Sequence, residues 1–245
     1  MSKTALVTGA TRGIGLGIAT RLAEQGYALT ISARDPHRLG TVAEDLLRLG
    51  AKDVVVVAGD MADQNTVHKM IDLHADQFGT LNALVLNAGF GASGTIAEYS
   101  MRRFDKTIDI NLRAPLTLVQ RALPLLRAAA TADPERGAKV VALASITGVY
   151  AEAGLAVYGA TKAALISMIE TLNAEESGNG ITATAIAPAF VDTDMATWIH
   201  DTIPPESMIQ VDDLVELVDA LLRLSSRAMV SKLVVGRAAT TGYCA

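Results

Sequence analysis

Cysteine and long apolar runs are scarce in this sequence of 245 residues. The single cysteine, Cys244, cannot form a disulfide within the chain, so nothing in the sequence requires an oxidising compartment. No apolar run approaches the length of a transmembrane helix, and no charged leader with an apolar core precedes the strand-like residues that begin at Thr4. These absences predict a cytoplasmic protein that does not enter a membrane.

Positive charge and metal-binding patterns are lacking as well. The formal net charge is −5 and no basic run occurs, so neither nucleic acid nor an anionic membrane surface is an expected partner. Among the four histidines, His68 and His74 lie six residues apart, which places them on opposite faces of a helix. We therefore predict no metal site.

The sequence is rich in aliphatic residues: half of it is hydrophobic but only 4% is aromatic, as expected of strands buried on both faces. Short β-branched runs alternate with helical patterns along most of the chain. The runs cover residues 4–8, 28–33, 53–58, 83–86, 139–144, 181–187 and 232–235. This alternation predicts an α/β fold, a Rossmann-type doubly wound parallel sheet of about seven strands, in a single domain over residues 1–245.

Local signals mark where some of the helices begin. Asp35 before Pro36 offers an N-cap followed by proline at the first helical position, and Asp212 or Asp213 is expected to cap the last long helix. The one long stretch without a clear pattern covers residues 196–210. Loops of this kind in α/β proteins often lie over the site, so we expect a substrate cover at about residues 190–211.

A glycine-rich turn follows the first predicted strand. Its sequence is Thr8-Gly9-Ala10-Thr11-Arg12-Gly13-Ile14-Gly15, and an apolar helical pattern comes next. Glycines at such a turn permit a tight bend and close approach of the backbone to a pyrophosphate, which then lies at the positive end of a helix. The turn therefore predicts a dinucleotide site whose contacts come from Gly9, Thr11, Arg12, Gly13, Ile14 and Gly15.

The end of the second predicted strand indicates which dinucleotide is preferred. A cofactor without a 2′-phosphate is usually held by an acidic residue there, whereas the phosphate calls for arginine. The strand ends in Ile31-Ser32-Ala33-Arg34, and Arg12 is a second cation that could reach the same phosphate. We predict NADP(H), with NAD(H) as the alternative.

Ser145, Tyr158 and Lys162 form a chemically suggestive set. Tyr158 and Lys162 are four residues apart, so a helix would place the phenol and the ammonium on one face. A neighbouring positive charge favours the ionised phenol, so the pKa of Tyr158 is expected to fall from its usual value, about 10. Tyr158 is thus a candidate general acid and base.

Asn111 lies in a long helical pattern that also contains Pro115. Proline has no N–H to give to the carbonyl four residues earlier, so the Asn111 carbonyl should be free to hold a water molecule. The alternative is that Asn111 only bends the helix.

With these motifs in order, the chain resembles the short-chain dehydrogenase/reductase family over nearly its whole length. The resemblance implies that Tyr158 donates a proton to a carbonyl oxygen that Ser145 holds. Lys162 would bind the nicotinamide ribose and lower the pKa of Tyr158, and Asn111 would anchor a proton-relay water. The resemblance also implies that further cofactor contacts come from Asp60, Met61, Asn87, Ala88, Gly89, Pro188, Val191 and Thr193.

The sequence departs from the family in two places. Ala189 stands where the family usually has glycine, and because alanine resists positive φ, the loop that holds the carboxamide is expected to be re-shaped. The last ten residues, 236–245, resemble a subgroup that includes reductases of 3-hydroxy acids and other small carbonyl compounds. That second resemblance is much weaker than the family one.

The resemblance implies an NADPH-dependent oxidoreductase that reversibly reduces a ketone or other carbonyl to a secondary alcohol. One alternative is a 3-oxoacyl thioester reductase of lipid metabolism, and another is a non-catalytic NADP-binding protein. Phe90, Val149, Met195, Trp198 and Ile199 are expected to line an apolar substrate pocket. The two long helices after Met101 and Leu155 carry surplus apolar residues, so we expect a homotetramer, with a homodimer as the alternative.

Overall fold

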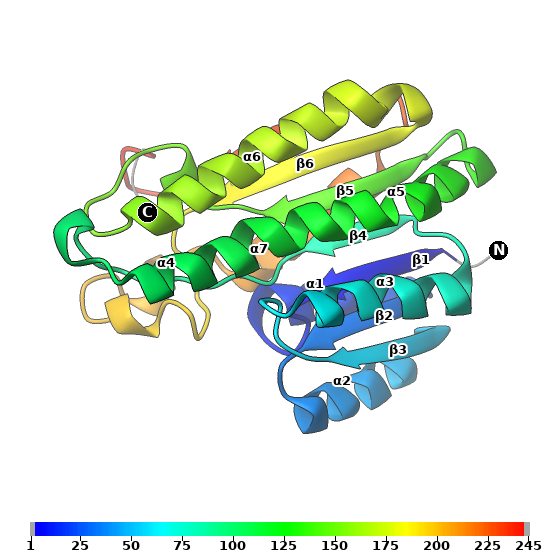
Figure 1. The fold of residues 1–245 in the computed structure, drawn as a ribbon, viewed down its shortest axis with the longest axis horizontal. Coiled ribbons are helices and arrows are strands. Elements are labelled where there is room, and N and C mark those ends of the chain that lie inside the picture. The colour runs from blue at the N-terminus through cyan, green and yellow to red at the C-terminus, as the bar shows by residue number, and fades with distance from the viewer. Residues whose placement is uncertain (1–2, 243–245) are drawn as a thin grey trace.

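The structure, a computed structural model, describes residues 3–242. Its centre is one parallel sheet of seven strands in the order β3-β2-β1-β4-β5-β6-β7 (Figure 1). The strands are β1 (Thr4–Thr8), β2 (Ala28–Ala33), β3 (Asp53–Ala58), β4 (Ala83–Leu86), β5 (Ala138–Leu143), β6 (Ile181–Pro188) and β7 (Lys232–Val235). The strand order reverses between β1 and β4, which is where dinucleotides bind in folds of this type. The predicted doubly wound sheet is confirmed.

Within residues 3–242 there are seven α-helices, and all but α4 pack against the two faces of this sheet. They are α1 (Gly13–Glu24), α2 (Pro36–Leu49), α3 (Gln64–Phe78), α4 (Met101–Ile108), α5 (Ala114–Ala132), α6 (Ala156–Glu176) and α7 (Val211–Arg223). Helices α3, α5 and α6 lie on the near face in Figure 1. Two separate apolar cores result, one shared by α1, α2 and α7 and the other by α3, α5 and α6.

Capping chemistry sets the start of two helices. Asp35 accepts hydrogen bonds from the backbone of His37 and Arg38, and Pro36 opens α2, as predicted. The prediction for α7 was wrong, because Gln210 is the N-cap and neither Asp212 nor Asp213 is. The carboxylate of Asp213 instead reaches back to the Gln210 N–H at 3.0 Å, which completes a capping box one turn inside the helix.

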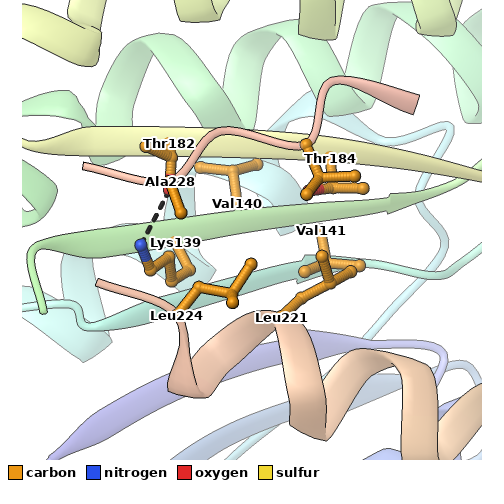
Figure 2. Close-up of a pocket in the computed structure, with 9 residues that line it drawn as sticks. Lys139, Val140, Val141, Thr182, Thr184, Leu221, Leu224 and Ala228 are labelled. Atoms are coloured by element: carbon orange, nitrogen blue, oxygen red, sulfur yellow. Dashed lines mark hydrogen bonds between the residues drawn. The ribbon is translucent and has the colours of Figure 1, made fainter. Parts of the chain in front are cut away.

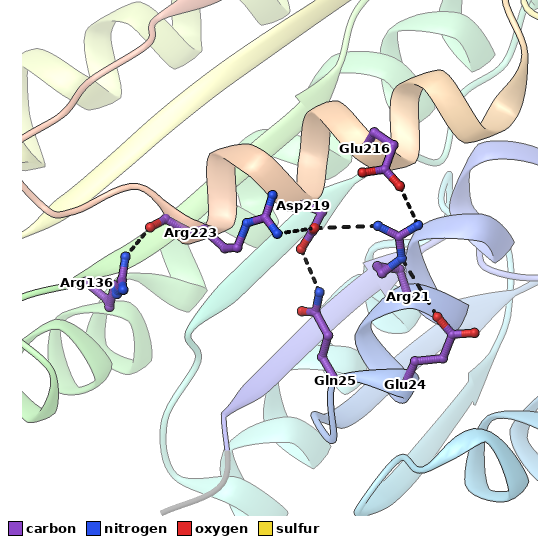
Figure 3. A network of polar contacts seen from close by, with 7 residues as sticks. All are labelled: Arg21, Glu24, Gln25, Arg136, Glu216, Asp219 and Arg223. Atoms are coloured by element: carbon purple, nitrogen blue, oxygen red, sulfur yellow. Dashed lines mark hydrogen bonds and ion pairs between the residues drawn. The ribbon is translucent and has the colours of Figure 1, made fainter.

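A polar network joins α1 to α7 on the far side of the sheet (Figure 3). Asp219 on α7 is only 5% exposed, and it accepts a hydrogen bond from Gln25 at 2.6 Å. Arg21 and Arg223 lie 3.5 and 3.1 Å from the other Asp219 oxygen, so the buried carboxylate is paired on both sides. The first and last long helices are therefore fixed to one another.

No helix within residues 3–242 combines the length and apolar character that crossing a membrane would require.

Candidate active site

The glycine turn after β1 has the geometry of a phosphate cradle. Gly9 and Gly13 have φ angles of +68° and +52°, which side-chain-bearing residues rarely adopt. A Cβ at Gly15 would lie 2.3 Å from both the Gly9 carbonyl oxygen and Asn87 Nδ2, so only glycine fits there. Arg12 is the N-cap of α1, but no side chain caps the helix, which leaves its first turn able to bind an anion. These features fit a dinucleotide pyrophosphate.

The segment after β4 is tied to this turn by Thr8. The Thr8 hydroxyl accepts hydrogen bonds from the backbone N–H groups of Asn87 and Ala88, each at 3.0 Å. Asn87 Nδ2 in turn donates to the carbonyl oxygens of Thr8 and Gly9. A Cβ on Gly89 would lie 3.5 Å from Lys162 Nζ. The predicted cofactor residues Asn87, Ala88 and Gly89 therefore connect the glycine turn to the predicted catalytic residues.

Ser145, Tyr158 and Lys162 come together at the carboxyl end of β5 and the start of α6. Lys162 Nζ lies 5.6 Å from the centre of the Tyr158 ring and donates to the Leu143 carbonyl at 2.7 Å. Ser145 lies close enough to the Tyr158 phenol to lower the pKa of that group. The i, i+4 spacing predicted this juxtaposition for Tyr158 and Lys162, and the structure brings Ser145 to the same point.

Burial, and not the lysine, controls the ionisation of this pair. Burial raises the pKa of Tyr158 to about 12, although the hydrogen bond from Ser145 opposes the shift. The predicted decrease was wrong, because desolvation of the phenol itself outweighs the groups that favour its ionised form. Lys162 is only 4% exposed, and its own burial lowers its pKa to about 8. Tyr158 is consequently a protonated phenol at neutral pH.

Asn111 lies where the long helix widens into a π-helical turn, Asp109–Arg113, between α4 and α5. Pro115 follows it, and π-helical turns inside α-helices are frequent at functional sites. The Asn111 side chain is fully used: Oδ1 accepts from Phe90 N, and Nδ2 donates to Phe90 O and to Thr161 Oγ1. Thr161 Oγ1 donates to the Tyr158 carbonyl. Asn111 thus joins the segment after β4 to α6, a contact that the sequence did not predict.

The predicted phosphate-binding arginines differ in their surroundings. Arg34 is exposed just after the end of β2, so its guanidinium is accessible to a charged ligand. Arg12 Nη1 instead lies 3.2 Å from Asp194 Oδ2, an ion pair that sequence reasoning missed.

Asp60 and Met61 follow β3, as predicted, but only one of their side chains is accessible. Met61 is 8% exposed and packs into the core under α3 and α5. Asp60 accepts a hydrogen bond from Ala62 N, and its other carboxylate oxygen lies 3.9 Å from Lys106 Nζ. The same ammonium lies 5.3 Å from the centre of the Phe90 ring. Lys106 therefore lies beside two predicted site residues, Asp60 and Phe90. No motif in the sequence pointed to it.

The predicted substrate cover consists of short turns, and Pro204 and Pro205 prevent a helix from continuing through it. It contains two 3-10 turns, Thr197–Ile199 and Pro205–Ser207, and a parallel bridge between Val191 and Ile209 joins the two ends of the segment. Met195 and Trp198 are 51% and 59% exposed, so they do not belong to the core. A Cβ on Gly91 would lie 3.9 Å from both Met195 Sδ and Tyr158 Cε2, which places the cover beside the phenol.

The other predicted residues between Pro188 and Thr193 have different surroundings: one faces the glycine turn, and the others lie at or beyond the end of β6. A Cβ on Gly13 would lie 3.2 Å from Thr193 Cγ2, so Thr193 faces the glycine turn. Pro188 ends β6, and Val191 is buried beside it. Ala189 donates its N–H to Val235 O at 2.8 Å and has no positive φ, so the loop accommodates alanine without strain at this position.

Two other candidate sites carry no chemistry of this kind. A small pocket under α7 is lined by Lys139, Val141 and Leu221 among others, but it lies at the amino end of β5, opposite the end that leads to Ser145 (Figure 2). His74 is buried between Thr30 Oγ1 and Thr80 O. Within residues 3–242, no group of three histidine, cysteine or acidic side chains is arranged to hold a metal.

A doubly wound sheet with a glycine cradle beside a serine, a tyrosine and a lysine defines an oxidoreductase of the Rossmann class. Residues 3–203 match the family model described as short chain dehydrogenase. A 3-oxoacyl-[acyl-carrier-protein] reductase FabG from Staphylococcus aureus is 34% identical over 213 residues, which is 86% of this chain and 83% of that relative. The chain belongs to the short-chain dehydrogenase family.

Solved structures agree with this assignment. A short chain dehydrogenase from Burkholderia cenocepacia in complex with NADP is 30% identical, with a TM-score of 0.83 and 94% of each chain covered. A 3-ketoacyl-(acyl-carrier-protein) reductase from Brucella melitensis complexed with NADH is 25% identical, with a TM-score of 0.85 and 97% of each chain covered.

Proposed function

We propose that the protein is an NADPH-dependent reductase that converts a carbonyl group into a secondary alcohol, in a reversible reaction. The observation that carries this proposal is the convergence of Ser145, Tyr158 and Lys162 beside Gly89, which borders the glycine cradle. A non-catalytic dinucleotide-binding protein would not need a protonated phenol next to a serine hydroxyl at the edge of the cofactor cradle.

The end of β2 supports the phosphate-bearing cofactor. Ser32 and Ala33 offer no carboxylate to a ribose hydroxyl, and Arg34 is exposed beside them. The Burkholderia relative was solved with NADP, whereas the Brucella relative was solved with NADH, so the family itself does not fix the choice. The assignment to NADP(H) rests on Arg34 and, secondarily, on Arg12.

The bound nicotinamide would supply the hydride. Tyr158 is protonated at neutral pH and donates its phenolic proton to the carbonyl oxygen as that oxygen gains negative charge. Ser145 donates a hydrogen bond to the same oxygen, and the Lys162 ammonium, 5.6 Å from the ring centre, stabilises the phenolate that remains. Asn111 holds α6 against the segment after β4, and its main-chain carbonyl is proposed to anchor the water that returns the proton.

The cover supports an apolar, uncharged substrate. Phe190 and Trp198 pack edge to face with ring centres 5.8 Å apart, and Met195 lies beside Tyr158. No lysine or arginine occurs between Phe190 and Gln210, so a short free carboxylate would find no partner there. A ketone with an apolar chain is favoured, and an acyl thioester, the substrate type named for the FabG relative, is the second candidate. The assembly is proposed to be a homotetramer or homodimer.

Replacement of the proton donor tests the proposal. Tyr158→Phe is expected to abolish nearly all ketone reduction and to leave NADPH affinity unchanged, because the ring stays and only the hydroxyl is lost. Rates with NADPH and a ketone panel are measured beside fluorescence titration of NADPH. Tyr27→Phe is the control, since Tyr27 is a buried tyrosine in the apolar core shared by α1, α2 and α7, on the other face of the sheet from α6. Substantial turnover by Tyr158→Phe would show that another group supplies the proton.

A further inference from the structure

Thr147 makes two hydrogen bonds to the catalytic serine. The Ser145 oxygen accepts from the backbone N–H of Thr147 at 3.3 Å and from its hydroxyl at 3.0 Å. Both residues are only 8% exposed, so water does not compete freely for these groups. The two residues form the start of a buried 3-10 turn, Ile146–Gly148, that follows β5.

The hydrogen-bonding capacity of a hydroxyl decides where the Ser145 proton points. A serine hydroxyl has two acceptor lone pairs and one donor proton. Thr147 occupies both lone pairs, so the proton of Ser145 has to be directed at another acceptor. The Tyr158 phenol is the group near enough for Ser145 to lower its pKa, which places it on the remaining side of the serine hydroxyl. A hydroxyl that already accepts hydrogen bonds is a stronger donor, because neighbouring hydrogen bonds polarise one another.

Two glycines hold Thr147 in this place. A Cβ on Gly159, the residue after Tyr158, would lie 2.7 Å from the Thr147 carbonyl oxygen. A Cβ on Gly148 would lie 2.7 Å from the Lys162 carbonyl carbon and 2.8 Å from Ala163 N. Real side chains essentially never approach so closely, so the turn rests directly on the backbone of α6 at the level of Tyr158 and Lys162. The position of Thr147 is therefore fixed by the same helix that carries the proton donor.

We infer that Thr147 is a positioning residue for the reaction: it saturates the acceptor sites of Ser145 and thereby directs the serine proton toward the oxygen that Tyr158 protonates. In its absence the serine can turn its proton toward the backbone or toward water, and the oxygen loses a preorganised donor. The inference rests on the proposed carbonyl reduction, in which Ser145 and Tyr158 act on one oxygen.

Thr147→Val and Thr147→Ser separate this role from packing. Valine keeps the shape and removes the hydroxyl, whereas serine keeps the hydroxyl and loses a methyl group. We expect kcat for ketone reduction to fall about tenfold in Thr147→Val, the effect of losing roughly one hydrogen bond in the transition state. Thr147→Ser is expected to retain most of the wild-type kcat. The Kd for NADPH and the ketone KM should change little in either variant.

Thr107→Val is the matched control, because Thr107 is fully buried and its hydroxyl donates to the Arg103 carbonyl, away from Ser145. It should leave kcat unchanged. If Thr147→Val does not fold, as judged by NADPH titration and the melting temperature, Thr147→Ala replaces it in the comparison with Thr147→Ser. Equal kcat values in the hydroxyl-free and hydroxyl-bearing variants would overturn the inference.

The outcome is distinguishable from failure of the proposed function. An inactive Tyr158→Phe together with a fully active Thr147→Val would refute the role of Thr147 alone. An active Tyr158→Phe would refute the proton donor itself, whatever Thr147→Val does. Gly159→Ala is a second, independent test of the inference. Its added methyl group has to displace the Thr147 carbonyl, so kcat for ketone reduction is expected to fall as it does in Thr147→Val.

Discussion

Among single residues, Arg12 lies within the glycine turn and Arg34 follows β2, and the two have different surroundings. Arg34 is exposed, while Arg12 is paired with Asp194. We expect Arg34→Asp combined with Arg12→Gln to weaken NADPH binding by several kcal/mol, because charge-assisted contacts are lost and a like charge is added. NADH binding should change far less. Titration of both cofactors measures the effect, with Arg38→Gln, an exposed arginine in α2, as the control. A wild-type protein that uses NADH as well as NADPH would contradict the charge argument.

Residue identities were more predictable than residue environments. Ser145, Tyr158, Lys162 and Asn111 could be selected from spacing and resemblance, and the structure brings them together. The direction of the Tyr158 pKa shift could not be predicted, because the spacing reports the neighbouring ammonium but not the burial of both groups. The role of Thr147 was missed, although the pattern Ser-x-Thr is visible, since which lone pairs a hydroxyl uses depends on the local turn.

Among the elements, the predicted cover at residues 190–211 is expected to set the substrate specificity. Met195 and Trp198 present apolar surface near Tyr158, and the cover has no cation. Specificity constants are therefore expected to rise with the length of the apolar chain in a homologous series of ketones, and to be low for matched free 3-oxo acids. Both series are compared at saturating NADPH. A clear preference for the short charged acids would redirect attention to cations elsewhere, such as Arg103 or Arg113.

The predicted strand boundaries agree closely with those in the structure. Five of the seven strand ranges match the β-branched runs; β5 begins and ends one residue earlier than predicted, and β6 extends one residue further, to Pro188. The start of α7 was misassigned because two acidic residues next to a glutamine fit the capping rules in more than one register. The π-helical turn at Asn111 was foreseen only as a disruption near Pro115, since a proline indicates that a bond is missing but not how the helix re-forms around it.

For the molecule as a whole, helices α4 and α5 each leave a large apolar residue exposed, whereas α6, the second helix on which the oligomer prediction rests, exposes none. Leu116 on α5 is 43% exposed and Met101 on α4 is 65% exposed. We expect a homotetramer, or a homodimer, in light scattering at micromolar concentration. Leu116→Glu should shift the population toward smaller species, because a charge would be buried in the interface. Leu47→Glu on α2, where Leu47 is 47% exposed, is the control. A monomeric wild-type protein would contradict the prediction.

The free energy of unfolding is expected to depend on pH through Lys139. Lys139 is 6% exposed, and burial lowers its pKa to about 8 from 10.5. Between these values the unfolded chain binds a proton that the folded chain does not, so the free energy of unfolding rises with pH. Relative to Lys139→Met, the wild type should gain up to about 3 kcal/mol from pH 8 to pH 10.5. Urea unfolding of both proteins at the two pH values measures the difference. A difference that does not change with pH would show that the ammonium is solvated.

The network around Asp219 also constrains how the chain acquires its structure during synthesis. Arg21 belongs to the first helix and Gln25 caps its end, while Asp219 and Arg223 belong to the last helix. The apolar core on that face contains Leu22 and Leu46 together with Leu214 and Val218, so its wall is incomplete until α7 has left the ribosome. The opposite core, built by α3, α5 and α6, has all of its helices by residue 176. A nascent chain therefore has one face of the sheet covered while the other, including the underside of the glycine turn, still waits for the last seventy residues or so.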